Sequence, residues 1–211
     1  MNVKDVIINL LGLKLIYLKI KMGIKYKGSN DTWGLVAILF HWILAILLFI
    51  QFASGIRLST LNFSSLKLEL IDMHQSIGSL ILILVFIRFL WRTNNTKPSN
   101  NNLPHLHATL SHFTHLIVYL LLFSIPILGI LYNWLSDLDI ILFGTFTIPN
   151  ILSIENDDLA DILIEFHFYF ALLLMLIVFI HISAAFYHLI IIRDKYKIFH
   201  RMGFNSIKEK F

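Results

Sequence analysis

The sequence has no cysteine, few charged residues and few helix breakers: its 211 residues include four prolines and nine glycines. The absence of cysteine excludes disulfides, thiolate metal sites, iron–sulfur clusters and covalent haem attachment through a C-x-x-C-H motif. Charged residues make up 14% of the chain, whereas an ordinary soluble domain has about 25%. Hydrophobic residues make up 57%, which excludes intrinsic disorder and leaves too little polar surface for a soluble domain. We therefore expect a membrane protein.

Four apolar stretches are long enough to cross a bilayer, which takes about 20 residues of helix. They run over residues 35–56, 71–91, 113–134 and 166–192. We expect an all-α membrane protein, a bundle of four transmembrane helices within a domain of residues 31–203. Residues 1–30 are expected to form a basic N-terminal extension or an interfacial helix, and residues 204–211 a basic tail. The alternative for residues 1–21 is that Met22 is the true start.

Lys and Arg are distributed unevenly among the connections of these spans. Fifteen of the seventeen lie before the first span, around the second connection or after the fourth span, and none lies in residues 135–165. Nine of the thirteen acids lie on the opposite side. By the positive-inside rule, both termini and the second connection are cytoplasmic. The net charge of +4 is thus a topology signal and gives no support for nucleic-acid binding.

Ten histidines are unusual in so apolar a chain, because histidine inside a span is costly and usually marks function. Four of them match in depth: His41 with His181 towards the cytoplasmic side, and His74 with His167 at the outer ends of their spans. His167 and His181 are 14 residues apart and therefore share one helix face, about 21 Å apart in depth. This arrangement suits two bis-histidine haems stacked across the bundle, where facing helices supply the ligands.

Other polar side chains lie near the cytoplasmic ends of the spans. Arg88, 14 residues after His74, shares its helix face and is expected to hold haem propionates or to reach lipid phosphate. His115, with Tyr119 one turn later, is a candidate for the quinone side or for a proton relay.

His188, seven residues after His181, is a second candidate for the quinone side. Either His115 or His188 is also an alternative to His41 as the inner ligand. Three further histidines lie in polar surroundings and are expected to be solvated: His105, His107 and His200.

Several segments together resemble the bacterial cytochrome b561 family over about residues 30–203. The matching segments are 40–42 (FHW), 73–78 (MHQSIG) leading to Arg88, 112–119 (HFTHLIVY), 126–129 (PILG), 165–167 (EFH) and 181–185 (HISAA) followed by His188, with a tail of Arg193-Asp194 and Arg201-Met202. The set of histidine spacings carries the resemblance, because any one spacing alone is common.

The resemblance implies two non-covalent haems b in four helices that exchange electrons with quinone. It implies His41 and His181 as axial ligands of the inner haem, and His74 and His167 as those of the outer haem. The branch that the chain resembles most is the superoxide oxidase type, in the bacterial inner membrane, which passes electrons from superoxide to ubiquinone. The cofactor carries the chemistry, while the protein supplies ligands and an apolar surrounding.

The outer surface argues against superoxide as the donor, because an anion is steered by positive charge and acids predominate there. An anion-entry site would depend on Arg57 and Lys67, although Arg57 is also a candidate partner of the outer haem propionates.

Two other functions compete with a stand-alone superoxide:ubiquinone oxidoreductase. The first is a b-type cytochrome anchor subunit that passes electrons between a peripheral dehydrogenase or hydrogenase and quinone. Its acidic third connection would dock that redox protein. The second is a proton or metal transporter that uses the histidines directly. The lack of carboxylates inside the spans argues against a transporter, since every Asp and Glu lies at or beyond a span end.

Overall fold

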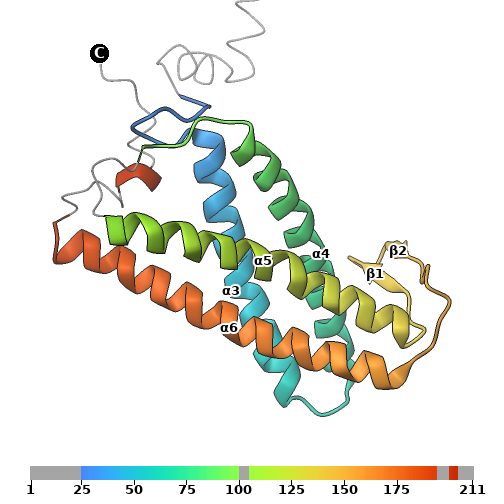
Figure 1. Ribbon diagram of the computed structural model, residues 1–211. Coiled ribbons are helices and arrows are strands. Elements are labelled where there is room, and N and C mark those ends of the chain that lie inside the picture. Colours follow the sequence, from blue (N-terminus) through green and yellow to red (C-terminus); the bar gives the residue numbers. More distant parts are fainter. Residues whose placement is uncertain (1–24, 100–104, 194–199, 204–211) are drawn as a thin grey trace, which may run out of the picture.

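The computed structural model describes residues 25–99, 105–193 and 200–203 (Figure 1). The expectations for residues 1–21 and for the tail of residues 204–211 lie outside this described part. Both described ends of the chain lie at one end of the bundle, which we call the terminal end. A small β-hairpin lies beside the helices towards the opposite end, which we call the hairpin end.

Four long helices account for most of the described residues, as the sequence predicts. They are α3 (Leu35–Thr60), α4 (Ser65–Thr93), α5 (His105–Leu135) and α6 (Asp157–Ile190). Each is long and apolar enough to cross a membrane. A single 3₁₀ turn, η1 (His200–Met202), follows them.

Three of the four helices begin well before the apolar stretches predicted from the sequence. Polar N-caps explain two of these starts: the side chain of Ser64 accepts from the amide of Lys67, and that of Asn156 accepts from the amide of Leu159. Such caps satisfy amide groups that the first turn leaves free. α5 likewise begins at His105, so His112 and His115 lie inside the helix and not at its start.

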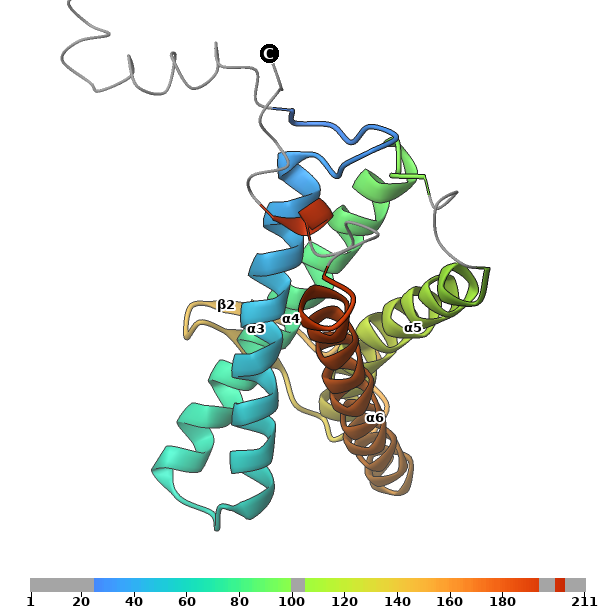
Figure 2. The same cartoon turned by 90° about the vertical axis from the view of Figure 1, so that its left-hand side faces the viewer.

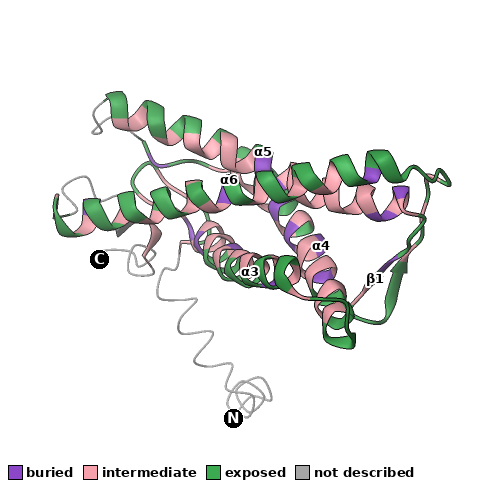
Figure 3. Cartoon of the chain, turned by 90° about the horizontal axis from the view of Figure 1, so that it is seen from below, coloured by how far each residue is buried: buried purple, intermediate pink, exposed green. Residues whose placement is uncertain are grey.

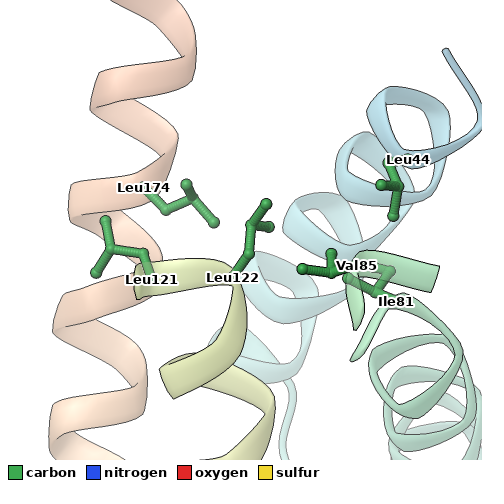
Figure 4. Close-up of a cluster of buried hydrophobic side chains, with 6 residues drawn as sticks. All are labelled: Leu44, Ile81, Val85, Leu121, Leu122 and Leu174. Atoms are coloured by element: carbon green, nitrogen blue, oxygen red, sulfur yellow. The ribbon is translucent and has the colours of Figure 1, made fainter. Parts of the chain in front are cut away.

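The helices pack as two antiparallel pairs, α3 with α4 and α5 with α6, and α4 joins the pairs by packing against α5. Figure 2 shows the two pairs splayed apart from each other. Where they meet, one apolar cluster is buried, drawn in Figure 4: Leu44, Ile81, Val85, Leu121, Leu122 and Leu174. The outward surfaces of the helices are exposed and apolar (Figure 3), as expected for contact with lipid.

A β-hairpin occupies part of the third connection, between α5 and α6, where the sequence predicts no strand. Strands β1 (Ile140–Leu142) and β2 (Phe146–Ile148) pair antiparallel, with Ile141 opposite Thr147. The same connection also contains the first turns of α6, from Asp157. The predicted all-α membrane architecture with four spanning helices is confirmed, and one short sheet lies outside the bundle.

Candidate functional site

His74 of α4 and His167 of α6 face each other in the half of the bundle nearer the hairpin end. Their ring centroids are 6.1 Å apart and their planes are inclined by 60°. Both side chains are largely enclosed by the bundle. The structure therefore brings together the outer pair that matching depth predicts.

Neighbouring residues of α3 fix the position of His74. The hydroxyl of Ser54 lies 2.9 Å from its Nδ1, and the side-chain amide of Gln51 donates to its backbone carbonyl at 2.9 Å. Gly55 lies against the ring, where a Cβ would come within 3.4 Å of Cε1. α3 thus supplies both a hydrogen-bond partner and space for the imidazole.

His167 is held in the same manner by α5. Its Nδ1 donates to the backbone carbonyl of Ile125 at 2.8 Å. Gly129, one turn later, lies against the ring, where a Cβ would approach both Cε1 and Nδ1 to 3.3 Å. A side chain at this glycine would push the imidazole away from that carbonyl.

These contacts determine which ring nitrogen of each outer histidine carries a proton. A carbonyl can only accept, so Nδ1 of His167 is the N–H and Nε2 has the free lone pair. The hydroxyl of Ser54 donates to the carbonyl of Gln51 at 2.9 Å, which leaves its oxygen to accept from Nδ1 of His74. Both Nε2 atoms are therefore available as metal ligands, with the second nitrogen held as ligating histidines usually are.

Three histidines, and not two, meet in the half nearer the terminal end. The ring of His181 lies 6.5 Å from that of His41 and equally 6.5 Å from that of His115. Nδ1 of His115 donates to the carbonyl of Ser111 at 2.5 Å. The predicted inner pair is close in space, and the alternative ligand His115 is just as close.

The spacing of these rings fits a metal held between two imidazoles. An ion bound between two imidazole nitrogens by bonds of about 2 Å separates the ring centroids by roughly 6 Å. The observed separations of 6.1 and 6.5 Å agree with that value. Within each site the two imidazoles come from different helix pairs, His41 and His74 from the α3–α4 pair and their partners from α6, so a flat cofactor between the rings would fill the region where the pairs splay. The residues present therefore fit bis-histidine haem.

Arg88 lies beside the inner histidines and belongs to a basic and aromatic cluster. It interacts electrostatically with His41 and His181, and its guanidinium lies 5.8 Å from the ring of Tyr119. Arg92, one turn later, lies 5.6 Å from the same ring and 5.6 Å from the ring of Trp33. The buried hydroxyl of Tyr119 makes no hydrogen bond within the described residues.

This cluster is suited to an anion. Two neighbouring, partly buried guanidinium groups are costly without a negative partner, and cation–π contacts offset only part of that cost. The acids of α4, Glu69 and Asp72, lie several turns away at the other end of the helix. An anionic group of a ligand is the natural complement.

The remaining predicted residues lie near the two ends of the bundle. The ring of His188 is buried and lies 5.4 Å from that of His107, which is itself half-buried and so only partly exposed. His105 is exposed, as expected. At the hairpin end, Arg57 is exposed near the end of α3, and the ammonium of Lys67 donates to the carbonyl of Leu61 at 2.9 Å. The side chain of His200 lies outside the described part.

Sequence reasoning missed most of the residues that hold the outer pair. Gln51, Ser54 and Gly55 follow one another at helical spacing, and such polar and small residues are rare in this apolar span. These three residues on one face of an apolar span could have indicated a helix face that contacts a polar group. Gly78 lies against the amide of Gln51, where a Cβ would come within 3.1 Å of Nε2.

Comparison with known proteins gives consistent matches. The family model described as prokaryotic cytochrome b561 matches residues 32–203. The chain is 30% identical over 174 residues to cytochrome b561 homolog 2 of Escherichia coli (strain K12), covering 80% of this chain and 90% of the relative. It is 29% identical over 155 residues to the probable superoxide oxidase CybB of Yersinia pestis, covering 73% of this chain and 86% of the relative.

Proposed function

Because the chain belongs to the prokaryotic cytochrome b561 family of membrane electron-transfer proteins, we propose that it binds two haems b and transfers electrons to the quinone pool. The reaction we propose is that of a superoxide:ubiquinone oxidoreductase. The single observation that carries this proposal is the presence of two histidine sites, one in each half of the same bundle.

Haem b, bound at these sites, supplies one-electron redox chemistry. The chain's own residues supply the ligands: His74 and His167 for the outer haem, and His41 and His181 for the inner haem. By accepting hydrogen bonds from the Nδ1 atoms, Ser54 and the Ile125 carbonyl keep Nε2 of His74 and of His167 unprotonated and fix the orientation of both rings. The apolar cluster around Leu122 and Val85 lies in the middle of the bundle and excludes water.

Positive charge at the terminal end is proposed to hold the propionates of the inner haem. Arg88 is the nearest candidate because it borders His41 and His181. Arg92 and the hydroxyl of Tyr119, which has no hydrogen-bond partner among the described residues, extend that site. Arg57 remains the candidate for the outer haem.

We place quinone reduction at the terminal end, near His115, His188 and Tyr119. Reduction of ubiquinone to ubiquinol takes two electrons and two protons, and oxidation of two superoxide ions to oxygen supplies the electrons. His107 packs against His188, and it lies closer to the start of α5 than His115 does. These imidazoles are therefore proposed to carry protons from the aqueous surface.

The chain is a bacterial membrane protein, and we propose that its terminal end faces the cytoplasm. The distribution of Lys and Arg supports this orientation. Quinone would then take protons from the cytoplasmic side, while the donor would reach the hairpin end. The membrane would be the inner membrane.

Whether superoxide is the electron donor can be measured directly. A relative is named probable superoxide oxidase, and Arg57 and Lys67 are the candidate cations for anion entry. Superoxide generated by xanthine oxidase should reduce the purified haem-loaded protein in stopped flow, and superoxide dismutase should abolish that reduction. Catalase is included as the control for peroxide.

A different outcome would favour the anchor-subunit alternative. If ubiquinol reduces the haems but superoxide gives no dismutase-sensitive reduction, the donor is another molecule. The acids around the hairpin end, Asp137, Asp139 and Asp157 among them, are exposed. They would then be examined as a docking surface for a peripheral redox protein.

The hydrogen bond from Nδ1 of His74 to Ser54 gives a sharper prediction. Ser54→Ala should weaken binding of the outer haem by about 10–100-fold, the usual cost of losing a partner behind a metal ligand. Haem retention during dilution and the midpoint potential of the outer haem measure this effect. Ser54→Thr keeps the hydroxyl and should restore both.

Ser59→Ala is the matched control for this experiment. Its hydroxyl donates to the carbonyl three residues earlier at 2.8 Å, as that of Ser54 does, but it is exposed and lies near the end of α3. If Ser54→Ala leaves potential and retention at the level of Ser59→Ala, Ser54 does not position His74.

A further inference from the structure

The β-hairpin and the segment after it present an uncharged, apolar surface outside the helices. Residues 140–154 include no Asp, Glu, Lys or Arg, although Asp139 and Glu155 flank them. Phe146 is 71% exposed and Phe143 is 60% exposed. Three more large apolar side chains of this surface are exposed: Ile141, Ile151 and Ile154. So many exposed apolar side chains within one short uncharged segment indicate contact with a partner or a membrane.

The hairpin is attached to the flank of α4 and does not extend beyond its end. Ile140 is buried, with 1% of its surface exposed, and β1 packs against α4. The amide of Phe143 donates to the hydroxyl of Ser76 at 2.8 Å. Ser76 is eleven residues into α4, about 16 Å from its start. The hairpin therefore lies beside α4, a helix long and apolar enough to cross a membrane (Figures 1 and 3).

The turn of the hairpin holds an aromatic residue where glycine or asparagine is usual. Phe143 and Gly144 both have positive φ, 52° and 65°, and the amide of Thr145 donates to the carbonyl of Leu142 at 3.0 Å. Two-residue turns with this backbone favour Asn-Gly or Gly-Gly, and positive φ is strained for a bulky side chain. A phenylalanine that is both strained and exposed indicates that its ring has a partner.

The depth and composition of the hairpin identify that partner as lipid. The exposed side chains are large and apolar, like those on the outward surfaces of the helices, and aromatic rings favour the headgroup region. Unpaired sheet edges do not occur in the hydrocarbon core, so the strands must stay at the interface. The flanking acids, Asp139 and Glu155, limit insertion to the segment between them.

We propose that residues 140–154 form an interfacial anchor in the phospholipid headgroup region of the leaflet at the hairpin end. The anchor inserts Phe143 and Phe146 next to the acyl boundary. It is joined to α4 at Ser76, two residues from His74. Its contact with lipid therefore holds the helix that carries an outer ligand at a fixed depth. This inference does not depend on which molecule donates electrons.

The natural absence of cysteine makes the proposal directly testable. Phe146→Cys in the full chain, labelled with a fluorophore that reports polarity, is reconstituted in phosphatidylcholine nanodiscs. Two labelled controls are prepared in the same way. Asp158→Cys reports an exposed position outside residues 140–154, and Phe179→Cys reports the outward face of α6, where Phe179 is 68% exposed. All variants should elute as the parent protein does.

The label at position 146 should be quenched by lipids that carry a spin label near the headgroup. Aqueous iodide should quench it several-fold less than it quenches the label at position 158. Spin labels deep in the acyl chain should quench position 179 more than position 146. If iodide quenches positions 146 and 158 equally and lipid-borne quenchers do not act at 146, the hairpin faces water. Its apolar surface would then belong to a protein contact.

Discussion

Replacing either outer histidine should remove one and the same haem. His74→Ala and His167→Ala are each expected to lower the haem content from two per chain to one, because the two rings lie 6.1 Å apart and serve a single site. No covalent bond retains a haem whose axial ligand is lost, since the chain has no cysteine. The pyridine haemochrome assay against protein concentration measures this loss.

The double variant provides the decisive comparison. His74→Ala combined with His167→Ala should lose no more haem than either single change, and the remaining haem should keep the same midpoint potential in all three. His105→Ala removes an exposed histidine and should retain both haems. If the double variant loses both haems while each single variant loses only one, the two histidines serve different sites and the pairing is wrong.

Replacing the inner histidines should likewise remove one haem, and comparing the variants should identify the second ligand of the inner haem. His181→Ala is expected to remove the inner haem, because its ring lies within 6.5 Å of both His41 and His115. His41→Ala should remove the same haem. His115→Ala should retain it, since we assign His115 to the quinone side, and should instead slow electron transfer to ubiquinone.

Haem content and single-turnover kinetics separate the two roles of the inner histidines. Retention of the inner haem in His41→Ala together with its loss in His115→Ala would reverse the assignment. The outer haem serves as an internal control for folding in every inner variant, because its ligands lie nearer the other end of the bundle.

Much of this architecture was predictable from composition and spacing. A chain with 57% hydrophobic residues and four long apolar stretches has few alternatives to a four-helix membrane bundle. Helical periodicity was enough to place His167 and His181 on one face, and matching depth paired them with His74 and His41, with His115 and His188 left open as alternatives to His41. Both pairs are adjacent in the structure.

Other features depend on contacts between helices, which no local pattern encodes. The hydrogen bond from His74 to Ser54 depends on the rotation and register of α3 against α4, and the bond from His167 to Ile125 depends on those of α5 against α6. The approach of His115 to His181 likewise requires the crossing of α5 and α6. Depth in the membrane alone does not specify these rotations.

The sequence by itself determined that the chain spans a membrane and at which two depths its histidines lie, because hydropathy and helical rise are local properties. Tertiary structure decided which neighbour fixes each imidazole, since a hydrogen bond requires two helices in one register. It also decided that residues 140–148 form a hairpin against α4. A turn with positive φ at Phe143 is unfavourable locally and is compensated by the distant hydroxyl of Ser76.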